Sequence, residues 1–227
     1  MRIKAKFTDL GLIRYKDAFD YQEKTHSEIV AAKLGRAEPR YEEIIFCEHY
    51  HVYTLGKSGD QNNLLIDYIQ LQAKNAEFYH TNRGGDITYH GPGQIVGYPI
   101  IDLDARKIGV KKYVWLLEEA IILTLKEYGI IAERMQGATG VWMDSKNPIK
   151  ARKINAIGVR VSRGVTMHGF AFNINTDLSY FQYINPCGFV DKGVTSLAVE
   201  LGKEINIAEV KSILLKKISN LLDIELV

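Results

Sequence analysis

The strongest constraint on the fold is a pair of runs in which apolar and polar residues alternate, residues 153–161 and 165–175. A short turn that contains Gly164 separates the two runs. Alternation with a period of two is typical of β-strands, and two such runs joined by a short glycine-containing turn predict a β-hairpin. The hairpin would hold Lys153, at the start of its first strand, in a fixed position.

A cysteine follows the hairpin in an aromatic-rich stretch without regular alternation. Pro186 and Gly188 flank Cys187 and constrain the backbone around its thiol. A lone cysteine is more often a small buried apolar residue than a nucleophile. Cys47 fits that description, because it lies in the apolar run 43–47, which predicts a buried strand and an inert thiol. The loop position of Cys187 instead favours a reactive role.

Residues 83–98 form a second distinctive segment, with five glycines in sixteen residues. Its first half shows no helical or strand period, so we predict a loop, and glycine-rich loops let the backbone approach a ligand closely. A purely structural glycine turn is the alternative. The polar residues that favour a ligand-binding loop are Arg83, Asp86, Thr88, Tyr89 and His90.

Two glycine-containing stretches resemble nucleotide-binding motifs only superficially. Residues 56–58 end like a Walker A loop, but His51 stands where that loop needs a glycine, and turn-forming residues follow in place of a helix. In residues 91–93 the glycine spacing departs from the dinucleotide fingerprint, and a predicted strand follows. We therefore predict neither an ATP site nor a Rossmann site.

His49 and His51 lie two residues apart in the predicted strand 43–55, a spacing that would direct both imidazoles to one side. This invites a metal site, but two ligands without an evident third make a weak one. Solvated or hydrogen-bonded histidines are the preferred interpretation. We predict no metal ion and no cofactor.

The remaining periodicity predicts an α/β (α+β) fold in which a mixed sheet is flanked by helices. The predicted helices span residues 15–34, 64–74, 110–128, 195–201 and 208–222, and further strands span residues 77–81, 94–101, 130–134 and 139–143. The chain has 227 residues, of which 25% are charged, and this size suits a single domain over residues 1–227.

Composition limits the partners and the compartment. No apolar run reaches membrane-spanning length, and the charged residues 1–6 do not resemble a signal peptide, so we expect a cytoplasmic protein that does not bind membranes. Two cysteines far apart in sequence predict no disulfide. A net charge of +2 gives no indication of nucleic-acid binding.

Several of these segments together closely resemble one known family, the lipoyl(octanoyl) transferases. The segments are Lys153 with residues 156–158, residues 168–170, residues 185–188 and residues 83–94. The resemblance extends from about Leu12 to Leu201. Tyr50 and His51 depart from the proline-containing approach that the family often shows at this point.

The resemblance implies a biotin/lipoyl protein ligase-like fold and an octanoyl-[acyl-carrier-protein]:protein N-octanoyltransferase activity. Acyl carrier protein would donate the octanoyl group to a lysine of a lipoyl domain, in 2-oxoacid dehydrogenase E2 subunits or in glycine cleavage H protein. Cys187 and Lys153 are implied as the catalytic residues. The implied substrate-binding residues are Arg83, Gly84, Gly85, Asp86, Ile87, Thr88, Tyr89, His90, Ala156, Ile157, Gly158, Gly169, Phe170 and Ala171.

The chemistry of a lysine beside a cysteine supports this pairing. Lowering a thiol pKa from about 8.5 to about 7 takes roughly 2 kcal/mol, and an ammonium at about 4 Å supplies about 4 kcal/mol at an effective dielectric constant near 20. Lys153 would therefore suffice as the cation that favours the thiolate, and it could also accept the thiol proton. The alternative is a lysine that extends to solvent at a sheet edge.

The sequence also suggests where the substrates would bind. An apolar slot for the acyl chain is expected near Val96, Tyr98, Ile157, Val159 and Phe170. The cationic residues Lys150, Arg152, Arg160 and Arg163 could receive an acidic carrier protein, although charges at hairpin ends are usually only solvated. Two further functions remain open: an octanoyl amidotransferase that acts between lipoyl domains, and a non-catalytic module that binds lipoyl domains.

Overall fold

The computed structural model describes residues 2–185 and 193–227, and the predicted hairpin lies at its centre. Strands β9 (Arg152–Ser162) and β10 (Val165–Asn173) pair antiparallel, which confirms the prediction. The turn between them has positive φ at Arg163 (51°) and Gly164 (77°). Two consecutive residues of this conformation match the twist of a tight hairpin.

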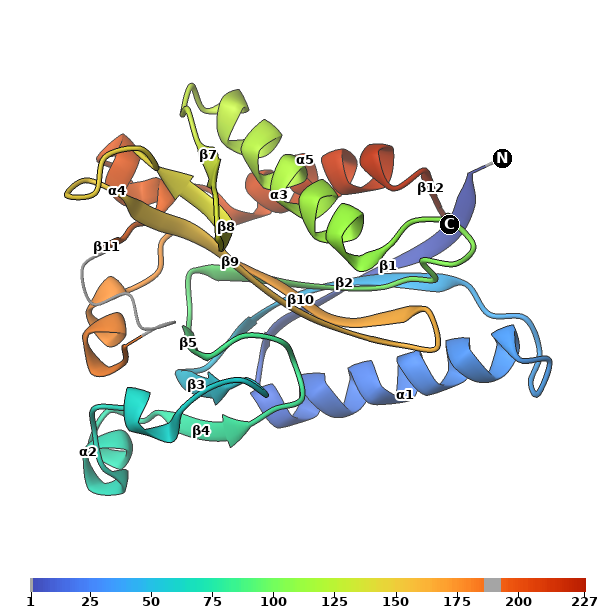
Figure 1. Cartoon of the computed structure of the whole chain (residues 1–227), viewed down its shortest axis with the longest axis horizontal. Coiled ribbons are helices and arrows are strands. Elements are labelled where there is room, and N and C mark those ends of the chain that lie inside the picture. The colour runs from blue at the N-terminus through green and yellow to red at the C-terminus, as the bar shows by residue number, and fades with distance from the viewer. Residues whose placement is uncertain (1, 186–192) are drawn as a thin grey trace.

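In the part of the chain that the structure describes, the hairpin belongs to a nine-stranded mixed sheet (Figure 1). Its other strands are β1 (Ile3–Ile13), β2 (Glu42–His49), β6 (Gln94–Ile100), β7 (Glu133–Met135), β8 (Ala138–Met143), β11 (Gly193–Val194) and β12 (Ile224–Leu226). The strand order is β12-β1-β2-β6-β10-β9-β8-β7, and β11 pairs with β9. The pairs β1–β12, β1–β2 and β9–β11 are parallel, and the other pairs are antiparallel.

Helices cover both faces of this sheet (Figure 1). Helix α1 (Tyr15–Lys33) lies on one face, and α3 (Val110–Glu127) and α5 (Ile207–Leu221) lie on the other. The short helix α4 (Leu197–Leu201) precedes α5. Successive residues of a strand face opposite sides, so the apolar run in β2 is buried on both. The observed arrangement confirms the predicted fold class.

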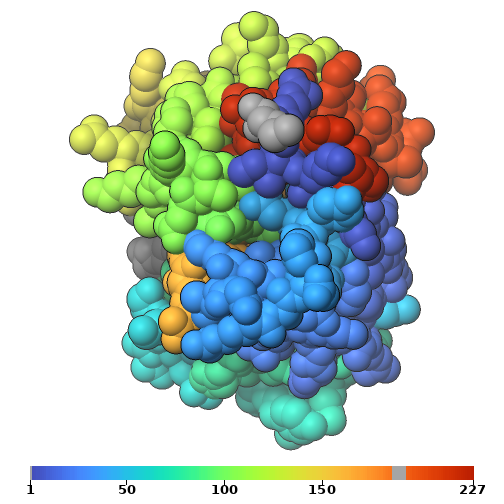
Figure 2. Space-filling model, turned by 90° about the vertical axis from the view of Figure 1, so that its right-hand side faces the viewer, coloured from blue at the N-terminus to red at the C-terminus, as the bar shows by residue number. Residues whose placement is uncertain are grey.

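The two chain ends lie side by side in this sheet. Strand β1 pairs with β12, with Ile3 opposite Ile224. Figure 2 shows the same proximity on the molecular surface, where the first segment lies beside the last helix. Among the described residues, none of the helices combines the length and the apolarity that crossing a bilayer requires.

A smaller sheet lies below the first in Figure 1. It contains β3 (Val52–Leu55), β4 (Glu77–His80) and β5 (Ile87–His90), in the order β4-β3-β5. Helix α2 (Tyr68–Ala73) and the short 3₁₀ helices η1 (Gln61–Asn63) and η2 (Leu178–Tyr183) accompany it.

Three local predictions were wrong. The predicted strand 43–55 is two strands, because the chain leaves the large sheet after His49 and enters the small sheet at Val52. The first half of residues 83–98 is not all loop, since β5 forms there by pairing with β3. The predicted helix 64–74 begins only at Tyr68, after Asp67, which caps it by accepting a hydrogen bond from the Gln70 backbone N–H.

Candidate active site

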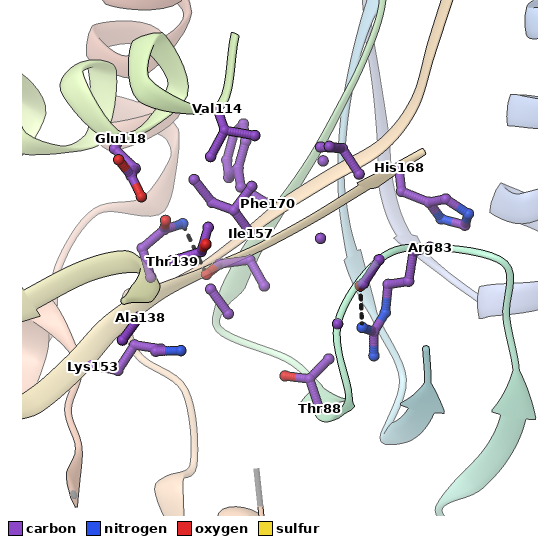
Figure 3. A pocket seen from close by; sticks show the side chains of 18 of the residues that line it. Arg83, Thr88, Val114, Glu118, Ala138, Thr139, Lys153, Ile157, His168 and Phe170 are labelled. Atoms are coloured by element: carbon purple, nitrogen blue, oxygen red, sulfur yellow. Dashed lines mark hydrogen bonds between the residues drawn. The ribbon is translucent and has the colours of Figure 1, made fainter. Parts of the chain in front are cut away.

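A pocket of about 870 Å³ lies between the hairpin, α3 and the glycine-rich segment (Figure 3). Most of the predicted site residues and all residues of the expected apolar slot line this pocket. The predicted residues that line it are Arg83, Gly84, Gly85, Asp86, Ile87, Thr88, His90, Lys153, Ala156, Ile157, Gly158, Gly169, Phe170 and Ala171. The slot residues Val96, Tyr98 and Val159 line it as well.

Tyr89 lies elsewhere, in the core of the small sheet. Its ring stacks on Tyr180 with 4.9 Å between the ring centroids, and its hydroxyl donates to Nδ1 of His51 at 2.7 Å. The side chain is fully buried. Tyr89 therefore supports the β5 segment from behind, while its neighbours Thr88 and His90 line the pocket.

Cys187 lies outside the described residues, but the described segments on either side of it reach the pocket. Before it, Phe181 of η2 lines the pocket, and the Asn185 N–H donates to the Asn63 carbonyl at 2.8 Å. After it, Val194 of β11 pairs with Lys153 of β9. Described residues from both sides of Cys187, namely Phe181, Gly193 and Val194, therefore line the pocket.

Lys153 occupies the pocket wall and not a sheet edge. It pairs with Trp142 of β8 on one side and with Val194 of β11 on the other. Its Nζ lies 4.7 Å from the centroid of the Trp142 ring, a cation–π distance. The Trp142 indole is itself fixed, because its Nε1–H donates to the Ala138 carbonyl at 3.0 Å. The half-buried side chain of Lys153 points into the cavity (Figure 3).

Arg83 ties the glycine-rich segment to the small sheet. Its Nη2 donates to the Thr54 carbonyl at 2.5 Å and to the Thr54 hydroxyl at 2.9 Å, and its Nη1 donates to the Gly84 carbonyl at 3.0 Å. Gly84 in turn donates its N–H to the Val159 carbonyl of β9 at 3.0 Å. A Cβ on Gly158 would lie 2.7 Å from the Gly84 oxygen, so glycine is needed for this close approach.

Asp86 links the same segment to the stretch that precedes Cys187. Its Oδ1 accepts from the Ile87 N–H at 2.7 Å, and its Oδ2 accepts from the Asn63 side chain at 2.6 Å. The Asn63 carbonyl holds the Asn185 N–H, as described above. Asn63 is thus a site residue that the sequence analysis missed, because only the fold brings η1 between these two segments.

Two buried histidines sit deep in the pocket as neutral donors. His90 Nδ1 donates to Gln94 Oε1 at 2.8 Å, and His168 Nε2 donates to Asn82 Oδ1 at 2.7 Å. Burial, followed by the charge of His49, lowers the pKa of His90 to about 3. Burial, followed by the charges of Arg83 and Arg160, lowers the pKa of His168 to about 3. Both rings are therefore uncharged at neutral pH.

His49 and His51 are hydrogen-bonded, as the sequence analysis preferred. His49 Nδ1 donates to the Ile13 carbonyl at 3.0 Å, and its Nε2 accepts from the Tyr98 hydroxyl at 2.7 Å. Burial lowers the pKa of His49 to about 4. His51 accepts from Tyr89 and stacks on Tyr180. Within residues 2–185 and 193–227, no group of three or more His, Cys, Asp or Glu side chains could hold a metal ion.

The other thiol is far less reactive than a surface cysteine. Cys47 is fully buried in β2, which confirms the predicted strand position. Burial strongly raises the pKa of its thiol. A group held in its thiol form is a poor nucleophile, because the thiolate is the reactive species.

The predicted cationic surface does not form one patch. Arg152 pairs with Asp144 and, at 2.6 Å, with Glu200. Arg160 and Arg163 instead line a separate groove of about 350 Å³ beside α1. Lys150 lies in the loop before β9 and is exposed.

This chain is similar to known proteins over nearly its whole length. Over residues 14–219 the chain matches the family described as the lipoyl protein ligase A/B catalytic domain. The octanoyltransferase of Christiangramia forsetii is 56% identical over 232 residues, which cover 100% of this chain and 99% of that protein. The chain belongs to the octanoyltransferase family. The resemblance seen in the sequence is thereby confirmed, and the protein is an acyltransferase.

Solved structures show the same fold at low sequence identity. A chain from the structure of a bi-partite lipoate protein ligase and its E2 lipoyl domain, from Thermoplasma acidophilum, has a TM-score of 0.71 at 15% identity and covers 99% of this chain and 86% of its own length. The biotin protein ligase of Aquifex aeolicus in complex with biotin and ATP has a TM-score of 0.55 at 14% identity, over 96% of this chain and 70% of its own. The biotin/lipoyl protein ligase-like fold is therefore confirmed.

Proposed function

We propose that this protein transfers an octanoyl group from octanoyl-acyl carrier protein to a lysine of lipoyl domains, through a thioester on Cys187. The acceptors would be the lipoyl domains of 2-oxoacid dehydrogenase E2 subunits and glycine cleavage H protein. The observation that carries the proposal is that Lys153 and nearly all the motif residues line one pocket, in a chain whose relatives are named octanoyltransferase. The two sheets would act as one catalytic domain, because this pocket takes residues from both.

In the first half-reaction, Lys153 accepts the thiol proton of Cys187, and the resulting thiolate attacks the carbonyl carbon of the donor thioester. The bond from that carbon to the carrier sulfur breaks as the bond to Cys187 Sγ forms. The carrier leaves as a thiolate and takes the proton back from Lys153 as its thiol. The pairing of Lys153 with Val194 supports this role, because it sets Lys153 beside the strand with which the described chain resumes after Cys187.

In the second half-reaction, the acceptor lysine attacks as a neutral amine. Lys153 takes a proton from that amine and returns it to the departing sulfur of Cys187, while the carbonyl carbon passes from sulfur to nitrogen. The first step exchanges one thioester for another, and the second converts a thioester into an amide of lower free energy, so neither step needs ATP. The intermediate also lets two bulky protein substrates use the same pocket in turn.

The apolar slot supplies binding energy for the acyl chain. Val96, Val159 and Phe170 line it, and the histidines deep in the pocket are neutral. An octanoyl chain offers about six methylenes, and burying each contributes about 0.8 kcal/mol, so the slot could contribute about 5 kcal/mol.

Incubation with octanoyl-carrier protein alone, without ATP or acceptor, tests this function by intact-protein mass spectrometry. One octanoyl mass should appear, map to Cys187, and be discharged by hydroxylamine or by apo lipoyl domain. Cys187→Ser should abolish productive turnover, whereas Cys47→Ala should retain it. Labelling of Cys47, or a requirement for ATP, would contradict the assignment. A preference for octanoyl-lipoyl domain over octanoyl-carrier protein as donor would favour the amidotransferase.

A further inference from the structure

The pocket is larger than an octanoyl chain requires. Its volume of about 870 Å³ falls in the range of about 300–1,000 Å³ that encloses a whole drug-sized ligand. Eight carbons in a linear chain fill only a fraction of such a space. Another part of a substrate must therefore share the pocket with the acyl chain, or the remaining volume must hold water.

The pocket has a closed sector and an open sector. In the closed sector the lining side chains of Val96, Tyr98 and Phe170 are each at most 3% exposed, which suits the end of an apolar chain. In the open sector, between α3 and the β7–β8 hairpin, the lining residues Lys111 and Thr139 are exposed. A substrate arm attached to a docked protein would enter the pocket through the open sector.

The rim of the open sector is cationic and aromatic. Two cations lie close to the Trp115 ring, with Lys112 Nζ 3.9 Å and the Arg134 guanidinium carbon 4.2 Å from its centroid. Arg134 is already paired, because it contacts Glu118 and Glu119. Among the described residues, Lys111 and Lys112 have no carboxylate partner, so their ammonium groups are available to bind an anionic group of a substrate.

The floor of the open sector exposes a short length of unpaired strand edge. The Val159 carbonyl accepts from Gly84, so it points away from β10, and in a regular strand Ile157 directs its N–H and carbonyl the same way. Pairing with β8 ends at Asn155. Ile157 pairs with Phe170 of β10 on one side, but on the side toward β8 no described strand pairs with it, and it lines the pocket (Figure 3).

We propose that the open sector binds the phosphopantetheine arm of the donor. This inference rests on the proposed use of an acyl carrier protein, whose arm carries a phosphodiester, then two secondary amides, then the thioester. Lys111 and Lys112 bind the phosphodiester. The backbone N–H and carbonyl of Ile157 form hydrogen bonds with an amide of the arm, as they would with a neighbouring strand. Four residues of strand, about 13 Å, separate Ile157 from Lys153, and the distal part of the arm spans this distance to bring the thioester to Lys153.

The test uses donors that shorten the arm stepwise: octanoyl-phosphopantetheine, octanoyl-pantetheine without the phosphate, and octanoyl-ethanethiol without the amides. For the unaltered protein, KM should rise about tenfold on loss of the phosphate, the effect of losing one charge-assisted hydrogen bond. It should rise again on loss of the amides. In the K111E/K112E variant the phosphate should give no advantage. Lys24→Glu, an exposed lysine on α1, is the matched control and should keep the full difference.

Each outcome decides a separate point. Equal KM values for the first two donors in the unaltered protein would overturn the arm site, as would a phosphate effect that survives in K111E/K112E. A K111E/K112E defect seen only with the intact carrier protein would place these lysines in protein docking and also overturn it. A separate outcome would contradict the proposed function itself, namely that none of the donors acylates Cys187 in the unaltered protein.

Discussion

At the scale of single residues, Lys153 is the group on which the proposed chemistry depends most. Its backbone is fixed by strands on both sides, and its Nζ rests near the Trp142 ring. A lysine held in this way loses little conformational freedom when it takes part in a reaction. The geometry is consistent with two roles, a proton acceptor and a fixed cation, and substitution can separate them.

Lys153→Ala should slow formation of the acyl-enzyme by orders of magnitude, because it removes both the proton acceptor and the cation. Folding should change little, since the side chain is only half-buried. Lys153→Arg keeps a cation but cannot release its proton near neutral pH, so it should also be slow if proton transfer is the essential role. Rapid-quench mass spectrometry gives the rate, and thermal unfolding monitors the fold. An unchanged rate and pH profile in Lys153→Ala would remove this residue from the mechanism.

At the scale of elements, the acyl slot is shaped where β6 and β10 pair. Gly97 of β6 lies opposite Phe170 of β10, and the Phe170 ring lies over the glycine. A Cβ on Gly97 would be 2.1 Å from the ring carbon Cζ. The ring can occupy its place because Gly97 has no side chain. The width of the slot therefore depends on this pair of positions.

Gly97→Ala should shift the preference of the enzyme toward shorter acyl chains. The new methyl group must displace the Phe170 ring into the slot, and overpacking of this kind typically costs about 1–3 kcal/mol of stability. Gly109→Ala is the matched control, because a Cβ there meets no atom within 4 Å. Comparing KM for a series of acyl-pantetheine donors measures the effect. A selectivity equal to that of the Gly109→Ala control would show that Phe170 does not bound the chain.

At the scale of the whole molecule, the sequence predicted the central hairpin, the long helices α1, α3 and α5, and the fold class, because regular periodicity carries those features. The break after His49 and the strand β5 were missed, since both depend on pairing in a second sheet whose strands are only a few residues long. The sequence also did not predict strand β1. The site was predicted from motifs, whereas Asn63 and the α3 rim are brought to it only by tertiary packing.

The buried histidines should make the stability of the whole molecule depend on pH. His49, His90 and His168 have folded-state pKa values of about 4, 3 and 3, below the 6.5 of an unperturbed histidine. Below pH 6.5 the unfolded chain binds protons that the folded protein excludes, so the free energy of unfolding falls as the pH falls. Each histidine contributes up to about 1.4 kcal/mol per pH unit between its unfolded and folded pKa values.

Urea unfolding at pH 7.0, 6.0 and 5.0 measures this dependence. We expect little change above pH 7, because all three rings are then neutral in both states, and a steepening loss below pH 6.5. His168→Gln should reduce the slope by the contribution of one histidine, since glutamine keeps a donor for Asn82 but does not titrate. His80→Gln, at an exposed ring, should leave the slope unchanged. A slope in His168→Gln equal to that of the unaltered protein would mean that His168 gains its proton in the folded state as readily as in the unfolded chain.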